Sequence, residues 1–218
     1  MVVSPHHDDE TIGCGGSLYL HALAGDSVSV VFVFAGWSAV PNISDRKKAA
    51  EVVQREARNA CRVLGVQRVI DLRIEDRTEQ LRDAISRKLV VCFREGLPDV
   101  VYVPHSGDGD REHSFISEAA REAVWMAESD YFPELGQTRP AIKTILGYEV
   151  WKPIQRVQYQ CDISLVIKIK ESALRKYRSQ LRFKNWLVGA VGLNAYRGAI
   201  GNCSYAEAFQ VIKISNIQ

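Results

Sequence analysis

The sequence predicts an α/β fold, a Rossmann-like three-layer sandwich built on a mainly parallel sheet. Short apolar runs rich in β-branched residues alternate with longer segments of helical periodicity over the first hundred residues. Their spacing is typical of βαβ crossovers, which require parallel strands. The 218 residues contain no internal repeat, low-complexity tract or linker composition, so we expect a single domain over residues 1–218.

The first elements follow from apolar patterning and turn residues. Residues 1–4 form a short opening strand, and residues 28–34 form a buried strand that ends at Ala-Gly. A long helix then begins near Ser44 as its N-cap and stops at Gly65. Its apolar stripe consists of Ala49, Ala50, Val53, Ala57, Ala60, Cys61 and Leu64.

A second strand–helix–strand unit follows. Residues 68–72 form a short strand, and residues 78–95 form an amphipathic helix that Gly96 and Pro98 close. Residues 99–104 form the next buried strand.

The last third of the chain is less regular. Residues 141–150 and 162–169 are expected as strands, and residues 171–183 as a helix. Residues 206–214 fit either a helix or a strand.

Composition excludes several classes of partner. A net charge of +2 is too small to indicate a nucleic-acid partner, and no apolar stretch is long enough to span a membrane. The first residues lack the pattern of a signal peptide, and the five cysteines are scattered without CxxC spacing. We therefore expect a cytoplasmic protein acting on a small molecule, and homo-oligomerisation stays open.

The first chemical cluster lies in residues 4–13, Ser-Pro-His-His-Asp-Asp-Glu-Thr-Ile-Gly. These residues follow a strand and precede a helix, where α/β proteins place their chemistry. His6 and Asp9 can grip one divalent metal ion while Asp8 stays free beside it. The structural alternative is a turn in which an aspartate caps the next helix.

The second cluster, residues 105–113, follows another strand of the predicted parallel sheet, so both loops leave the same edge. His113 completes a set of two histidines and one carboxylate with His6 and Asp9. Such a set favours zinc, or another divalent transition metal, over magnesium. The alternative for His113 is a solvated histidine at a helix start.

Metal chemistry then assigns roles. A bound zinc ion lowers the pKa of water to about 7 and polarises a carbonyl oxygen. Asp8 is placed to accept the water proton as general base and to pass it to a leaving amine. Glu112 is a candidate to orient His113 through its other ring nitrogen.

At these residues the chain resembles the PIG-L/LmbE family of zinc-dependent N-deacetylases. The resemblance rests on Pro5–Glu10, Gly13–Gly16, Glu56-Ala57, Ala60, Leu64-Gly65, Gly107-Asp108, Glu112-His113, Tyr177–Gln180 and Tyr205–Phe209. It implies a Rossmann-type domain that hydrolyses an acetamide, usually on an amino sugar or its conjugate. It also implies zinc ligands at His6, Asp9 and His113, and a general base at Asp8.

Three positions depart from the family pattern. His7 stands where the family usually has proline, and Val53 where its helix often has arginine. Asp110 replaces a histidine thought to stabilise the oxyanion or protonate the leaving group. His105 is a candidate substitute, although Asp110 is also a common turn former.

These departures leave function alternatives open. The leading expectation is N-acetyl hydrolysis on an amino sugar, sugar nucleotide or glycosylated metabolite, with Arg197 available to bind a substrate anion. The alternatives are an amidase for a non-sugar N-acyl conjugate and a binding homologue with impaired catalysis. A solvated surface arginine is the competing interpretation of Arg197.

Overall fold

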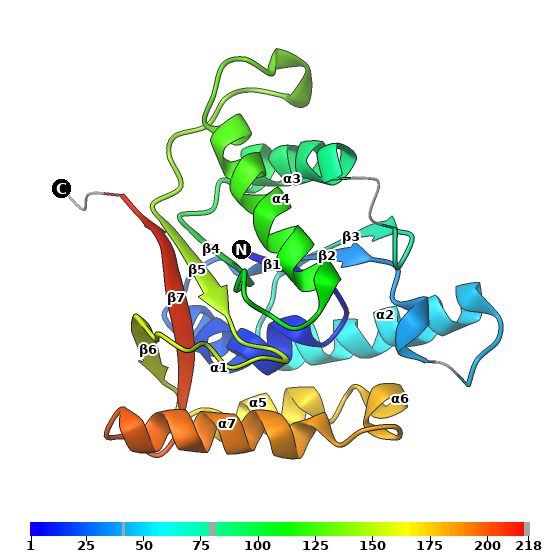
Figure 1. Cartoon of the computed structure of the whole chain (residues 1–218), viewed down its shortest axis with the longest axis vertical. Coiled ribbons are helices and arrows are strands. Elements are labelled where there is room, and N and C mark those ends of the chain that lie inside the picture. The colour runs from blue at the N-terminus through cyan, green and yellow to red at the C-terminus, as the bar shows by residue number, and fades with distance from the viewer. Residues whose placement is uncertain (41, 79–81, 216–218) are drawn as a thin grey trace.

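A seven-stranded sheet, ordered β3-β2-β1-β4-β5-β7-β6, forms the centre of the molecule (Figure 1). We describe it from a computed structural model, which covers residues 1–40, 42–78 and 82–215. Strands β1 to β5 pair in parallel, whereas β7 is antiparallel to both β5 and β6. The strands are β1 Val2–Ser4, β2 Ser29–Phe34, β3 Arg68–Ile74, β4 Val100–Pro104, β5 Thr144–Tyr148, β6 Tyr159–Asp162 and β7 Ala206–Ile214. The mainly parallel α/β architecture predicted from the sequence is confirmed.

Helices cover both faces of this sheet. Helices α3 and α4 pack against each other on one face, and α1 and α2 cover the other (Figure 1). Helices α5 to α7 form a further layer outside α1 and α2. The helices are α1 Asp9–Leu23, α2 Arg46–Val63, α3 Arg82–Gly96, α4 Arg111–Ala127, α5 Ile167–Leu174, α6 Arg178–Leu181 and α7 Trp186–Ile200, with short 3-10 turns at Trp37–Ala39 and Pro133–Leu135.

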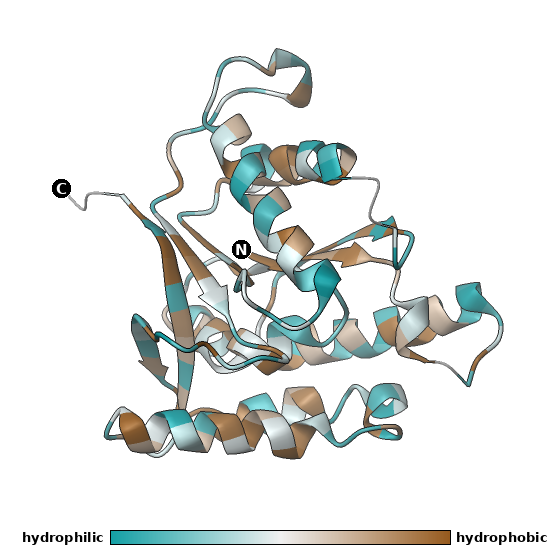
Figure 2. Ribbon diagram, in the orientation of Figure 1, coloured by the Kyte–Doolittle hydropathy of each residue, from teal (hydrophilic) through white to brown (hydrophobic). Residues whose placement is uncertain are grey.

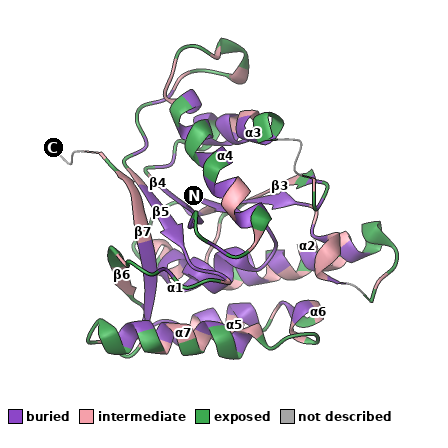
Figure 3. Ribbon diagram, viewed as in Figure 1, coloured by how far each residue is buried: buried purple, intermediate pink, exposed green. Residues whose placement is uncertain are grey.

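The alternation of side chains along the strands creates two apolar cores. Val3, Val31 and Val33 face α3 and α4, whereas Val2 and Val30 face α1 and α2. The central strands β1, β2, β4 and β5 are mostly apolar and buried, whereas the helices carry polar, exposed residues on much of their outer faces (Figures 2 and 3). This explains the apolar runs of the sequence, because a strand covered by helices on both sides has no polar face.

The C-terminal third corrects two sequence predictions. The strand expected at residues 162–169 is wrong, since β6 ends at Asp162 and α5 begins at Ile167. Asp162 accepts hydrogen bonds from the backbone and hydroxyl of Ser164, and this turn ends the strand. The single helix expected at residues 171–183 is split into α5 and α6, with Tyr177 in the break.

Other boundaries are settled by local contacts. Residues 206–214, ambiguous in sequence, form strand β7. The N-cap of α2 is Asp45, which accepts a hydrogen bond from Lys48 N at 3.2 Å, so the assignment to Ser44 is wrong. Helix α3 begins at Arg82, and residues 79–81 of the predicted helix lie outside the described residues. None of the described helices has the length and apolar composition that crossing a membrane requires.

The glycines after the first acidic cluster let α1 approach its neighbours. A Cβ on Gly13 would lie 2.2 Å from the Tyr148 ring, and one on Gly16 would lie 2.6 Å from Ile163. Helix α1 is kinked at Cys14, and the Glu207 carboxylate accepts the freed backbone N–H groups of Gly16 and Ser17. These glycines therefore serve close packing.

Candidate metal centre and its pocket

The two chemical clusters meet where the strand order reverses. Strand β1 lies between β2 and β4, and the loops that follow β1 and β4 leave their carboxyl ends side by side. This is the position at which open α/β sheets bind ligands. Ser4 donates its hydroxyl hydrogen bond to the carbonyl of His6 at 2.7 Å and so fixes the turn.

Three ligand atoms converge there. His6 Nδ1 lies 3.2 Å from His113 Nε2, and Asp9 Oδ2 lies 3.3 Å and 3.2 Å from them, respectively. Corners spaced in this way surround a tetrahedral centre at about 2.0 Å, the distance at which zinc binds nitrogen and oxygen. Asp9 Oδ1 is buried without a hydrogen-bond partner, and a bound cation would compensate the charge of this carboxylate. The set therefore fits a divalent metal ion.

The outer partners differ from the sequence expectation. Glu112 Oε2 lies 2.8 Å from His6 Nε2, so Glu112 orients His6 and not His113. Asp108 instead faces His113, with Oδ1 3.2 Å from Nδ1 but without full hydrogen-bond geometry. Each histidine thus has a carboxylate behind it, which raises its basicity as a ligand.

The electrostatics of the cluster follow from burial and opposite charge. Burial alone would lower the pKa of His113, but Asp9 and Asp108 outweigh it and raise the pKa to about 9. Burial likewise opposes protonation of His6, whose pKa is nevertheless raised by Asp9 and Glu112. Burial favours the neutral form of Asp9, yet the two histidines hold its pKa well below the usual range. Asp9 is therefore an anionic ligand.

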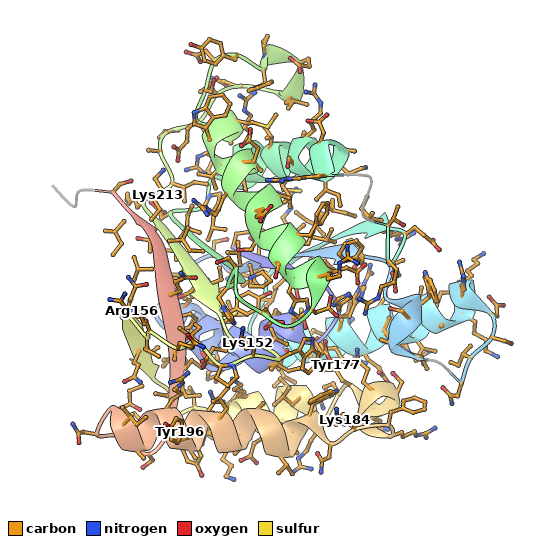
Figure 4. All side chains as sticks on the ribbon, in the orientation of Figure 1. Lys152, Arg156, Tyr177, Lys184, Tyr196 and Lys213 are labelled. Atoms are coloured by element: carbon orange, nitrogen blue, oxygen red, sulfur yellow. The ribbon has the colours of Figure 1, made fainter. Side chains whose placement is uncertain are left out.

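Asp8 is held in a strained position beside the ligands. It precedes α1 with a φ of 143°, a value unfavourable for a residue with a Cβ. Its backbone N–H donates to Glu10 Oε2 at 3.2 Å, and Glu10 Oε1 accepts a hydrogen bond from the Tyr177 hydroxyl at 2.5 Å. Tyr177, labelled in Figure 4, comes from the outer helical layer. Burial, and then the charges of Asp9 and Glu10, raise the pKa of Asp8.

A pocket of about 240 Å³ opens onto this site. It is lined by His6, Asp8, Ser38, Ala39, Arg77, Asp110, Trp151, Gln180, Phe183 and Trp186. The candidate metal ligand His6 and the carboxylate of Asp8 therefore share one solvent-accessible space. Its remaining walls combine polar groups with aromatic rings, as small-molecule sites do.

The three residues predicted to bind substrate lie in different surroundings. Asp110 lines the pocket and also caps α4, accepting a hydrogen bond from Glu112 N at 2.8 Å. His105 does not line this pocket, because both of its ring nitrogens bond to the backbone, at Lys152 O and Gly107 N. Arg197 is only 7% exposed, and its guanidinium pairs with Glu149 and donates to Ile154 O at 2.8 Å. The observed contacts of His105 and Arg197 are therefore with other parts of the chain, and substrate binding by either residue stays a prediction.

The two remaining histidines, His7 and His21, contact other side chains of the protein. His7 stacks on Phe32 with ring centroids 4.4 Å apart, and its Nε2 lies 3.3 Å from Asp71. His21 Nε2 lies 2.9 Å from the hydroxyl of Tyr102.

Sequence reasoning missed Arg77 and Trp151 as pocket residues. Both follow strands directly, Arg77 after β3 and Trp151 after β5, on the same edge as the metal site. Their positions after strands carried a usable signal, because every loop at that edge of a parallel sheet approaches the site.

Comparisons with known proteins place the chain among deacetylase relatives. The sequence model of the PIG-L family, described as GlcNAc-PI de-N-acetylase, matches residues 1–124. A protein named uncharacterized deacetylase YaiS, from Escherichia coli strain K12, is 27% identical over 82% of this chain and 90% of its own length. The diacetylchitobiose deacetylase of Thermococcus kodakarensis is 24% identical over 97% of this chain and 82% of its own.

A solved structure extends the likeness of fold to a different reaction. The 4-carboxy-2-hydroxymuconate hydratase GalB, from Pseudomonas putida KT2440, superposes with a TM-score of 0.86 at 21% identity. The match covers 100% of this chain and 97% of that one. The fold alone therefore does not determine the reaction, and the argument for function must come from the site.

Proposed function

Since this chain belongs to the PIG-L family, we propose that it is a zinc-dependent hydrolase that removes an N-acetyl group. The proposed substrate is an amino sugar, a sugar nucleotide or a glycosylated metabolite. The observation that carries the proposal is the convergence of His6, Asp9 and His113 beside Asp8, at a pocket open to solvent. The activity named for the diacetylchitobiose deacetylase supports an amino-sugar substrate.

The chemistry divides between the ion and the chain. When bound, zinc would lower the pKa of a water molecule and polarise the carbonyl group of the substrate. Asp8 accepts a proton as the water oxygen forms its bond to the carbonyl carbon. Asp8 then returns that proton to the amide nitrogen as the C–N bond breaks, so acetate and a free amine leave.

The surroundings of Asp8 suit this proton transfer. Burial and the neighbouring carboxylates favour its protonated form, and the charge of a bound cation opposes them. A carboxylate between these influences can both accept and return a proton. The backbone contact with Glu10 holds it near the pocket.

The aromatic rings of the pocket support binding of a ring-shaped substrate. Trp151 and Trp186 lie with ring centroids 4.2 Å apart, and Trp151 also stacks on His113. Such faces pack against the apolar side of a sugar ring. The cavity accommodates about one sugar unit, because its volume lies near the lower end of small-molecule sites.

The decisive test combines acetate release with metal analysis. Wild-type protein should release acetate from a panel of N-acetylated sugars. Asp8→Asn should keep bound zinc and lose at least about 100-fold of kcat, the usual contribution of a general base. His113→Ala should lose zinc as well, and Asp99→Asn, altered on the surface, should match wild type. Full turnover in Asp8→Asn would reject the assigned base.

A non-sugar N-acyl conjugate is the second candidate substrate. Asp110 favours it, because it replaces the histidine of the family pattern, and the exposed Phe183 adds an apolar wall. Comparing acetylated sugars with acylated amines and thiol conjugates separates the two. A binding homologue without catalysis is rejected if any substrate yields acetate above the metal-stripped control.

The cysteines bear on the cellular compartment. Five free thiols among the described residues, three of them buried, support a reducing cytoplasm. Self-association stays a prediction that light scattering tests.

A further inference from the structure

Arg77 is a positively charged residue in the wall of the pocket that opens onto the candidate metal site. Its Nη1 lies 3.2 Å from Asp110 Oδ2 and 3.3 Å from Glu112 Oε2. Glu112 Oε2 in turn lies 2.8 Å from His6 Nε2. Two carboxylates at the start of α4 therefore hold one guanidinium next to a metal ligand.

The backbone also commits Arg77 to this place. Its φ is 63°, in the left-handed region that only glycine adopts without cost. In this conformation its N–H donates to Glu112 Oε1 at 2.5 Å. The preceding residue, Asp76, is buried and accepts hydrogen bonds from Gly36 N and Ser38 N at 2.8 Å each. The turn is thus anchored to the loop after β2, and strain of this kind often marks a functional position.

Arg77 still has donors available for a ligand. Its side chain is 54% exposed, and the contacts to Asp110 and Glu112 use Nη1 only. A guanidinium carries five N–H donors, so the N–H groups of Nε and Nη2 remain to donate to a ligand in the pocket that Arg77 lines.

The replacement of the family histidine by Asp110 suggests a role for Arg77. Asp110 stands at the position of the family histidine, and the carboxylate there is a poor partner for an oxyanion. We propose that Arg77, held by Asp110 and Glu112, donates hydrogen bonds to the negative charge that develops on the substrate's carbonyl oxygen. This inference rests on the proposed deacetylase function and assigns to Arg77 the electrostatic part of the histidine's task.

An arginine in place of a histidine changes which group can donate a proton to the leaving amine. A guanidinium stays protonated at all accessible pH values and donates no proton to the leaving amine. Arg77 therefore stabilises charge only. Asp8 is left to return to the amine nitrogen the same proton that it took from water, which keeps the reaction balanced.

The test measures anion binding separately from turnover. Methylphosphonate mimics the tetrahedral, anionic form of an acetamide under attack, whereas acetate mimics the planar product. Calorimetry on zinc-loaded protein should show that Arg77→Gln weakens methylphosphonate binding at least about 10-fold, with a smaller effect on acetate. Arg82→Gln is the matched control, because Arg82 is 53% exposed and pairs with Glu118.

Kinetics supply the second readout. Arg77→Gln should lower kcat about 10²–10³-fold with little change in KM, the signature of a donor that acts in the transition state. Asp110→Asn keeps the helix cap but loses the charge that holds Arg77, so it should lie between wild type and Arg77→Gln. Arg77→Ala combined with Asp110→His should recover part of the lost kcat.

The outcomes discriminate clearly. Methylphosphonate affinities of Arg77→Gln and Arg82→Gln within twofold of each other would overturn the inference, as would an effect confined to KM. If wild type releases no acetate but Arg77 still selects the tetrahedral anion, the deacetylase proposal fails while the role of Arg77 stands.

Discussion

Three consecutive acids show how environment divides one chemistry into three tasks. Asp9 is buried but faces two histidines, which hold its pKa low and keep it anionic, as the proposed metal ligand must be. Asp8 is buried next to other carboxylates, which raises its pKa. Burial raises the pKa of Glu10 to about 7 even though it accepts hydrogen bonds from Thr11 and Tyr177. Local contacts and not residue type therefore separate the proposed ligand, base and positioning group.

At the same scale, Asp108 is expected to support the metal through His113. Asp108→Asn should lower zinc affinity about 10- to 100-fold, because the imidazole loses the carboxylate behind it. A zinc-competition titration measures this, and Asp99→Asn, on an exposed lysine pair, serves as the control. Unchanged affinity would show that the 3.2 Å contact with His113 carries no weight.

Among the elements, α1 connects the site to the outer layer. It starts in the metal cluster, kinks at Cys14 and packs through bare glycine backbone against β5 and the segment before α5. The kink exposes backbone N–H groups that Glu207 accepts, and Glu207 pairs with the buried Lys170 at 2.6 Å. The irregularity of α1 is therefore stabilised from β7 and α5.

Packing at Gly16 gives a stability prediction. Gly16→Ala places a methyl group 2.6 Å from Ile163, and we expect a loss of about 1–3 kcal/mol from overpacking. Gly192→Ala, with no atom within 4 Å of the new methyl, should instead stabilise by up to about 1 kcal/mol. Urea unfolding of both variants checks the contrast, and equal effects would contradict it.

The buried pair at Lys170 gives a second stability prediction. Lys170→Met should cost about 3–5 kcal/mol, because it leaves the Glu207 carboxylate buried without its cation. Lys168 pairs with Glu171, and its side chain is exposed. Lys168→Met should therefore lower the free energy of unfolding by less than about 1 kcal/mol. Denaturant midpoints of the two variants measure the difference. Similar losses would mean that Glu207 is satisfied by its backbone donors alone.

For the whole molecule, the metal site joins loops that are a hundred residues apart. His6 and Asp9 follow β1, and His113 lies in α4 beyond β4. A cation shared by both loops stabilises the folded state over the unfolded chain, in which the ligands are separated.

Metal removal should therefore lower thermal stability. At a free zinc concentration 100 times the Kd, binding contributes about 2.7 kcal/mol. For a chain of this size, that corresponds to a shift of roughly 5–10 °C in Tm. Scanning calorimetry with and without a chelator measures the shift, and His113→Ala should abolish it. An equal shift in His113→Ala would place the ion elsewhere.

By itself the sequence determined most of the sheet, two of its covering helices and the three side chains that converge as a candidate metal site. Apolar runs separated by helical stretches leave few ways to cover a parallel sheet, so β1 to β5 and the helices α2 and α3 follow from patterning. The acids and histidines at 6, 8, 9 and 113 were predictable because they follow strands, and such loops share one edge.

Only the tertiary structure decided what each polar group faces. Patterning cannot show that Glu112 turns to His6, that Arg197 is buried on Glu149, or that His105 bonds to backbone. The breaks around α5 and α6 likewise depend on distant partners, such as Tyr177 on Glu10. Side-chain pairing is a short-range, directional interaction between residues far apart in the chain, and periodicity carries no information about it.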